Sequence, residues 1–171
     1  VNYDLKYHWT ACTGIKTGRN GDGHVYLYHN VFYLTDRYGT CSGTNAITDA
    51  ADVPGSKNVI ARNNIFVLDI ASHNGDSTRY ISLKDTTTVV DFDYNLIYDY
   101  AGPLLSKIAG VSWNNFNSFV SATGFEQHGL YAIPQFTDAA NGDFSLLAAS
   151  PGIDTGILLP GFNDANSPWT Y

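Results

Sequence analysis

The stretch Val25-Tyr-Leu-Tyr-His-Asn30-Val-Phe-Tyr33 decides the fold, because it returns twice in altered form further along the chain. The copies are Val59-Ile-Ala-Arg-Asn-Asn64-Ile-Phe-Val67 and Val90-Asp-Phe-Asp-Tyr-Asn95-Leu-Ile-Tyr98. Asn64 follows Asn30 by 34 residues, and Asn95 follows Asn64 by 31 residues. Self-similarity at a period of about 20 to 50 residues indicates a solenoid, a propeller or another repeat architecture.

The number of strands in each repeat favours a solenoid over a propeller. Apolar segments separated by turn residues predict strands near 14–17, 31–34, 46–48, 65–68 and 80–84, besides the first half of each copy. Each repeat then holds three strands, whereas a propeller blade uses four strands over about 40 to 50 residues. We therefore expect each strand to stack on its counterpart one coil away.

The alternation of side chains along a strand predicts which residues fill the core. Carried straight through each copy, it gives three stacked sets: Val25, Leu27, Val31 and Tyr33; Val59, Ala61, Ile65 and Val67; and Val90, Phe92, Leu96 and Tyr98. Asn30, Asn64 and Asn95 fall at the corner between two strands. There an amide can hydrogen-bond to its copies and tolerate a left-handed backbone, so a structural ladder is favoured over a sugar or metal ligand. Asn2 is a candidate fourth member.

Composition bounds the class of protein. The 171 residues suit one domain, 1–171, and 44% of them are hydrophobic, which is enough for a core. A net charge of -7 with only nine Lys and Arg argues against a nucleic-acid partner. No apolar run reaches the roughly 18 residues of a membrane span. Cys12 and Cys41 are about one repeat apart, which leaves both a disulfide and two free stacked cysteines open.

The pattern loosens past Tyr100. Apolar residues at helical spacing between Trp113 and Gly124 predict a short helix, and two further strands are expected at 134–136 and 142–147. The end of a solenoid exposes its core and needs an atypical capping segment. We therefore expect coils over residues 1–100, and a last coil with a C-terminal cap over residues 101–171.

Several motifs in this region carry a resemblance to a known family: Trp113-Asn-Asn-Phe116, Ile133-Pro-Gln-Phe136, Gly142-Asp-Phe-Ser-Leu146 and Ser150-Pro-Gly-Ile-Asp-Thr-Gly156. The run resembles the C-terminal portion of secreted right-handed parallel β-helix proteins of the pectate-lyase-like group. The resemblance implies an all-β, single-stranded parallel β-helix with three strands per coil and a cap containing the helix. It also implies a fragment of a longer β-helix, with missing coils or a partner chain covering the N-terminal end of the stack.

Many members of this group bind or cut polysaccharides along one sheet, which would here hold the strands near 14–17, 46–49 and 80–84. With Ile15, Ile47 and Leu83 or Ile81 inward, the outward row is Lys16, Thr48 and either Lys84 or Ser82. A lyase needs a base and a cation that neutralises a uronate carboxylate. The candidates for catalysis are Lys16, Arg19 and Lys84, and those for substrate binding are Thr48, Asp49, Arg37 and Tyr38. The alternative is that these are solvated surface groups.

Other site chemistries are weaker in this sequence. A glycoside hydrolase needs two carboxylates about 5 to 10 Å apart; Asp36 and Asp49 are the best placed pair, and Glu126 is the only glutamate. Calcium takes six or more oxygen ligands, and the loop aspartates are scattered: Asp69, Asp76 and Asp85. Calcium is left open as a cofactor, and no metal site is assigned.

The sequence therefore predicts an extracellular or cell-surface carbohydrate-active β-helix whose partner is a polysaccharide. If it is an enzyme, a polysaccharide lyase acting on uronate-containing polymers or a glycoside hydrolase is expected. The opposing hypothesis is a non-catalytic β-helix scaffold, such as an adhesin, a phage tail-spike or a filament subunit, that binds surface glycans. Aromatic faces stack on sugar rings, and the candidates for such stacking are Tyr26, Tyr28 and Tyr38.

Overall fold

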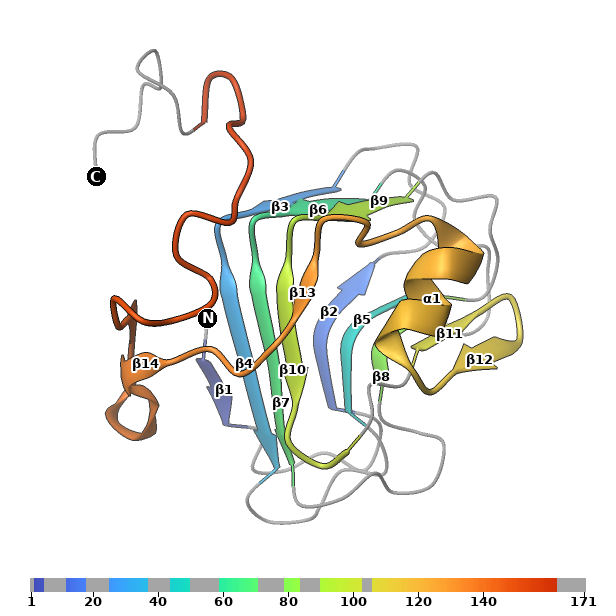
Figure 1. The fold of residues 1–171 in the computed structure, drawn as a ribbon. Helices are drawn as coiled ribbons and strands as arrows, with labels where there is room; N and C mark the ends of the chain where they lie inside the picture. Colours follow the sequence, from blue (N-terminus) through green and yellow to red (C-terminus); the bar gives the residue numbers. More distant parts are fainter. Residues whose placement is uncertain are drawn as a thin grey trace.

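Strands from successive repeats lie side by side in three sheets (Figure 1). This computed structural model describes residues 2–4, 12–17, 25–36, 44–49, 59–70, 79–83, 90–102 and 106–162. The first sheet contains, in order, β1 (Asn2–Asp4), β4 (Val31–Asp36), β7 (Ile65–Ile70), β10 (Leu96–Asp99) and β13 (Leu130–Tyr131). The second contains β2 (Cys12–Thr17), β5 (Thr44–Asp49), β8 (Arg79–Leu83), β11 (Ser106–Ile108) and β12 (Val111–Trp113). The third contains β3 (Val25–Tyr28), β6 (Val59–Arg62) and β9 (Val90–Asp93).

The pairing of these strands follows the sequence repeat. Val25 pairs with Val59 and Val59 with Val90, while Val31 pairs with Ile65 and Ile65 with Leu96, all in parallel strands. Only β12 runs antiparallel to its neighbour within these sheets. The predicted mainly β class with parallel sheets and one short helix is confirmed, and the arrangement is compatible with a β-helix-like solenoid.

A helix and a hairpin follow the stacked strands. Helix α1 (Phe116–Thr123) lies within the predicted range and begins where the Asn115 side chain accepts a hydrogen bond from the Ser118 N–H at 3.1 Å. The buried Phe119 of this helix belongs to the hydrophobic core. Beyond it, β14 (Phe136–Asp138), the 3-10 turn η2 (Ala139–Asn141) and β15 (Asp143–Leu146) form an antiparallel hairpin. No helix of the described ranges is long and apolar enough to cross a membrane.

The core confirms the predicted inward residues of the first strands wherever their side chains are described, which excludes Val90, but it does not confirm those of the second strands. Val59, Ala61 and Phe92 are buried in the core, and Val25 and Leu27 pack against it. In the second strands the core contains instead Phe32, Leu34, Phe66, Leu68 and Ile97. The residues predicted there fall on the opposite face: Val31, Tyr33, Ile65, Val67, Leu96 and Tyr98. Val67 and Leu96 are nevertheless buried on that face.

A left-handed residue at each corner causes this shift. His29, Asn63 and Tyr94 have φ values of 55°, 57° and 59°, so the left-handed position is the residue before each ladder asparagine. This bend interrupts the alternation of inward and outward side chains, and the second strand resumes one residue out of phase. A second correction concerns Asn2, which pairs with Tyr33 in β1 and β4 and therefore does not occupy the corner of an earlier repeat.

Candidate functional site

The three corner asparagines form a hydrogen-bonded ladder. Asn64 Oδ1 accepts from the backbone N–H and the Nδ2 of Asn30 at 3.0 and 3.2 Å. Asn95 Oδ1 accepts from the same two groups of Asn64 at 2.9 and 3.0 Å. Asn64 Nδ2 also donates to the Leu27 carbonyl at 2.8 Å, and Asn95 Nδ2 to the Ala61 carbonyl at 2.9 Å. The buried amides of Asn64 and Asn95 are thus engaged by the protein itself.

A buried carboxylate ends this ladder. Glu126 is fully buried, and its Oε1 accepts from Asn95 Nδ2 at 2.8 Å and from the Tyr80 hydroxyl at 2.6 Å. Its Oε2 accepts from the Asn95 N–H at 3.3 Å. Burial raises the pKa of Glu126 to about 7, although the hydrogen bonds from Tyr80 and Asn95 act in the opposite direction. Glu126 is therefore a structural acid.

The Glu126 side chain fits at the end of the ladder because the next repeat has Gly129 at the position where the three earlier repeats have asparagine. Leu130 pairs with Leu96, which places Gly129 in register with Asn95. A Cβ on Gly129 would lie 2.4 Å from Glu126 Oε2. The Glu126 carboxyl therefore fills the space beside a position that only glycine can occupy without displacement.

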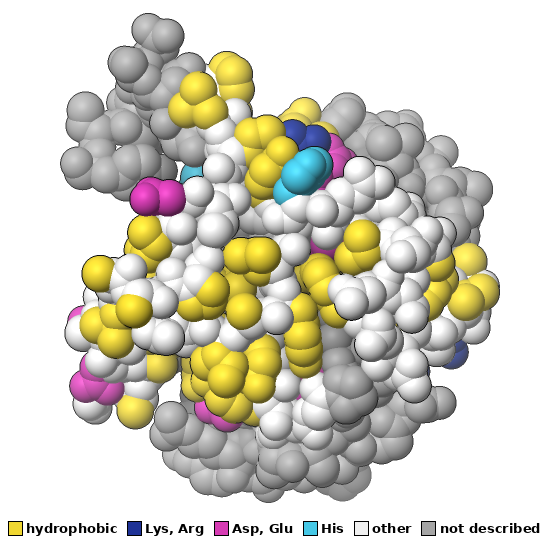
Figure 2. All heavy atoms as spheres, viewed as in Figure 1, with side chains coloured by type: hydrophobic (Ala, Val, Ile, Leu, Met, Phe, Trp, Pro, Cys, Tyr) yellow, Lys and Arg dark blue, Asp and Glu magenta, His cyan; other side chains and the backbone are white. Residues whose placement is uncertain are grey.

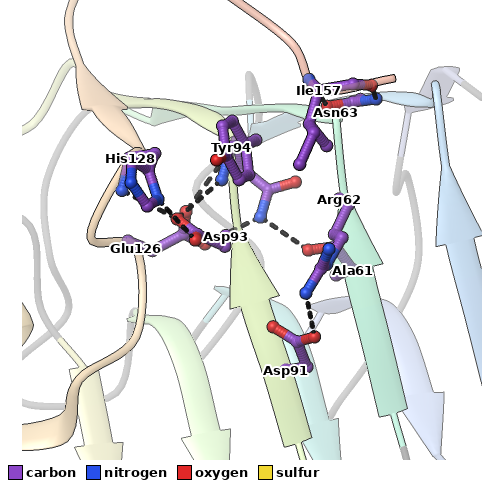
Figure 3. Close-up of polar contacts among 10 residues, drawn as sticks. Ala61, Arg62, Asn63, Asp91, Asp93, Tyr94, Glu126, His128 and Ile157 are labelled. Atoms are coloured by element: carbon purple, nitrogen blue, oxygen red, sulfur yellow. Dashed lines mark hydrogen bonds and ion pairs between the residues drawn. The ribbon is translucent and has the colours of Figure 1, made fainter. Parts of the chain in front are cut away.

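The outward face of the β3–β6–β9 sheet carries aromatic and charged side chains. The core takes the alternate residues of these strands, so the others point away from it. Paired across the three strands, the outward residues form two rows: Tyr26, Ile60 and Asp91, then Tyr28, Arg62 and Asp93. Arg62 forms an ion pair with Asp91 (Figure 3). Tyr28 packs edge-on against Phe162 with ring centroids 5.0 Å apart.

Asp93 holds a histidine at the end of this face. Asp93 Oδ2 lies 2.9 Å from His128 Nδ1, and Asp93 Oδ1 accepts from the backbone N–H groups of His128 and Tyr94 at 2.8 and 2.9 Å (Figure 3). The His128 ring also stacks on the Tyr94 ring, with centroids 4.6 Å apart and planes within 9°. Because Nδ1 faces Asp93, Nε2 lies on the far side of a ring whose side chain is 58% exposed.

These contacts set the charge of the carboxylate. Burial of Asp93 acts to raise its pKa, but hydrogen bonds from the His128 ring and from the backbones of His128 and Tyr94 outweigh it and lower the pKa. Asp93 is therefore ionised near neutral pH. In the space-filling view, histidine, basic and acidic side chains gather at the top of the molecule near β9 and β13 (Figure 2).

A pocket of about 520 Å³ is also lined by Tyr94, the residue that stacks on His128. The corner residues His29, Asn63 and Tyr94 line one wall, and the segment 152–158 lines the opposite one. Asn63 joins the two walls, because its Nδ2 donates to the Ile157 carbonyl at 2.7 Å and its Oδ1 accepts from the Ile157 N–H at 2.8 Å (Figure 3).

The sheet proposed from the sequence to hold the site has a different row of outward candidates. Lys16 is in register with Thr48, Thr48 with Ser82, and Ser82 with Lys107. The row therefore contains Ser82, one of the two predicted alternatives, and it continues to Lys107, which was not among the predicted candidates. The Thr48 hydroxyl donates to the Ser82 carbonyl at 3.0 Å, so it holds two neighbouring strands together.

The remaining candidates are less fully placed. For four candidates the structure gives only the strand that contains them: Cys12 and Lys16 in β2, Asp36 in β4 and Asp49 in β5. Several candidates lie outside the described residues: Arg19, Arg37, Tyr38, Cys41, Asp76, Lys84 and Asp85. Asp69 accepts a hydrogen bond from the Tyr33 hydroxyl at 2.7 Å. Within the described ranges, no group of three or more His, Cys, Asp or Glu side chains could hold a metal ion.

Sequence reasoning missed the outward row that contains Arg62 and Asp93. The repeat alignment placed both residues two positions before a ladder asparagine, and that signal could have identified their shared row. His128 had no such signal, because Gly129 replaces the asparagine that marks the corner. The comparisons found no matching family model, no matching curated protein and no matching solved structure. The function is therefore argued from the site.

Proposed function

We propose that this chain forms an extracellular right-handed parallel β-helix of the pectate-lyase-like kind, and that it binds polysaccharide. Three parallel sheets that each take one strand per repeat support the fold. Crossovers between parallel strands of one sheet are right-handed in about 98% of cases, which supports the hand. The asparagine ladder at the corner supports a regular stack in which corresponding positions of successive coils lie side by side.

The observation that carries the binding function is the Asp93–His128–Tyr94 contact on the outward face. The carboxylate and the stacked phenol fix the His128 ring before any ligand arrives, which lowers the entropy lost on binding. Arg62 and Asp91 lie on the same face and offer hydrogen bonds of both kinds. A flat ring flanked by donors and acceptors suits a sugar, whose ring has apolar faces and a polar rim.

A polysaccharide panel tests this function. The protein is incubated with immobilised neutral and uronate-containing polymers, and the affinity for those bound is then measured by calorimetry. His128→Ala should weaken binding about tenfold, the effect of losing about 1.4 kcal/mol of contact energy. Asn117→Ala, an exposed site on α1, is the matched control and should bind as the wild type does. Failure of every polymer to bind, or equal affinities of the two variants, would reject the proposal.

The same contact favours a second candidate, a uronate lyase. Asp93 fixes the orientation of His128, which would leave Nε2 to take the proton next to a uronate carboxylate, while Arg62 supplies a nearby cation. The elimination breaks the bond to the leaving sugar and gives an unsaturated product that absorbs in the ultraviolet. Product should accumulate with the wild type and much more slowly with Asp93→Asn. A binding protein that yields no product would be the scaffold of the opposing hypothesis.

A further inference from the structure

The pocket beside Asn63 is built by two segments far apart in the sequence. The left-handed corner at Asn63 directs its side chain outward, and the amide pairs with both backbone groups of Ile157. Gly156 allows the close approach, because a Cβ there would lie 3.1 Å from Asn63 Oδ1. The two walls are thus fixed relative to each other. The volume of about 520 Å³ falls within the range of about 300 to 1,000 Å³ found for small-molecule sites.

The lining of the pocket combines apolar and polar side chains. Ile65 and Leu96 come from the outward face of the first sheet, and Leu146 comes from β15. The polar lining includes His29, Tyr94, Asp154 and Thr155. An apolar surface with hydrogen-bonding groups around it matches a sugar ring, whose C–H groups form a face and whose hydroxyls point outward.

The charges of the lining select against an anionic ligand. Among the residues that the structure describes, no Lys or Arg lines the pocket, and Asp154 contributes a carboxylate. Burial lowers the pKa of His29, so its imidazole is neutral near pH 7. A uronate or phosphate group there would face the Asp154 carboxylate, and two like charges repel each other. An uncharged hydroxyl, by contrast, can donate to the Asp154 carboxylate in a charge-assisted hydrogen bond.

We propose that the pocket formed by the Asn63 corner and segment 152–158 is a binding subsite for one uncharged sugar residue. This inference rests on the proposed polysaccharide-binding function and adds the class of sugar and its position. Asp154 accepts sugar hydroxyls, Leu96 and Leu146 meet the apolar face of the ring, and Asn63 positions the segment that carries Asp154. The polymer then reaches the pocket from the corner at Tyr94, which also carries the stacked His128 ring.

Calorimetry with matched oligosaccharides tests the inference. Neutral hexose oligomers and oligogalacturonates of equal length are titrated into the wild type, Asp154→Asn and Asp143→Asn. The wild type should bind a neutral oligomer at least tenfold more tightly than the uronate oligomer. Asp154→Asn should weaken neutral binding about tenfold, as expected for one hydrogen bond to a charged group. Asp143→Asn removes the same charge from an exposed position on β15 and should have no effect.

Methyl NMR gives a second readout that does not depend on a variant. The resonances of Leu96, Leu146 and Leu158 should shift when the neutral oligomer is added. If an oligomer binds and His128→Ala weakens it, but Asp154→Asn and these methyl groups do not respond, the subsite is rejected while polysaccharide binding stands. Tighter binding of the uronate oligomer through the pocket would also reject it. If no oligosaccharide binds, the subsite and the proposed function both fail.

Discussion

Glu126 Oε1 lies 2.8 Å from Asn95 Nδ2, so a buried carboxylate ends the ladder that Asn30 and Asn64 begin. Asn64 and Asn95 each offer an oxygen to the asparagine before them, and each donates onward from its amide. The last asparagine instead donates to the Glu126 carboxylate, which has no hydrogen to donate when it is ionised. The end of the ladder is therefore sensitive to pH, because the Glu126 carboxyl titrates and the asparagine side chains do not.

The first prediction follows from the pKa of Glu126. Its value of about 7 in the folded protein lies above the ordinary 4.5, so the folded state binds more protons between these two pH values. The stability contributed by the group is fully present below pH 4.5 and is lost as pH rises through 7. The loss amounts to about 3 kcal/mol, as each pKa unit corresponds to about 1.4 kcal/mol. Urea unfolding at pH 4.5 and above pH 7 measures it.

Two variants separate Glu126 from other titrating groups. Glu126→Gln keeps an oxygen for Asn95 and Tyr80 but cannot titrate, so the fall in stability across this window should disappear. Tyr80→Phe removes a hydrogen bond that lowers the pKa of Glu126, so the fall should move to higher pH. A Glu126→Gln protein with the same pH profile as the wild type would contradict the assignment.

Substitution of Gly129 should disturb the end of the ladder sterically. In Gly129→Ala the new Cβ would meet Glu126 Oε2 at 2.4 Å and Glu126 Cβ at 2.8 Å. Overpacking of this kind costs about 1 to 3 kcal/mol. Gly142→Ala is a useful comparison, since Gly142 has a φ of 86° but nothing within 4 Å of the added Cβ. Thermal unfolding should show that Gly129→Ala costs less stability in a Glu126→Ala background, where the contact with Oε2 is absent, whereas Gly142→Ala costs the same in both backgrounds.

Substitution of Asn64, in the middle of the ladder, should cost more stability than substitution of Asn30 at its start. Asn64→Ala removes the acceptor of two Asn30 groups and leaves the Leu27 and Arg62 carbonyls without the Nδ2 donor. Losing several buried hydrogen bonds should cost about 3 kcal/mol or more. Asn30→Ala, at a half-buried position, should cost about 1 kcal/mol. The urea unfolding midpoints of the two variants give the comparison. Equal losses of stability would show that the buried middle position contributes no more than the half-buried first one.

Asp93 should give the opposite pH dependence from Glu126. Its pKa is lowered from 3.8, so its contribution to stability is present above pH 3.8 and is lost as pH falls through the folded value. Asp93→Asn should therefore lower the stability near neutral pH and reduce the loss of stability in acid. Unfolding of both proteins at a series of acidic pH values measures the difference. Parallel profiles would mean that the bond to His128 contributes nothing to folding.

Release of segment 152–158 provides a test of the pocket wall. Asn63→Gly keeps a residue that accepts the φ of 57° but removes both hydrogen bonds to Ile157. The Ile157 amide should then exchange with deuterium at least tenfold faster, while the amide of Leu96, bonded to the Asn64 carbonyl, should keep its protection. Unchanged exchange at Ile157 would show that other contacts hold the segment.

Patterns in the sequence predicted the strands but not which side of the second strand faces the core. The repeat located β4, β7 and β10, because each follows an asparagine at a constant position. The inward residues of these strands were wrongly assigned, because a single left-handed residue such as His29 changes the phase. Tyr98 illustrates the consequence: it was expected in the core but packs edge-on against the exposed Tyr100, with centroids 4.9 Å apart.

The sequence by itself determined the period, the parallel stacking and the identity of the corner asparagines, since these depend on residue types that recur at fixed distances. The tertiary structure decided what lies beside the corner. Asp93 meets His128 across 35 residues, and Asn63 meets Ile157 across 94 residues. Such contacts depend on where the chain returns after α1 and the hairpin. The residues adjacent to each of these positions do not predict that path, because the segments that follow α1 and the hairpin are not part of the sequence repeat.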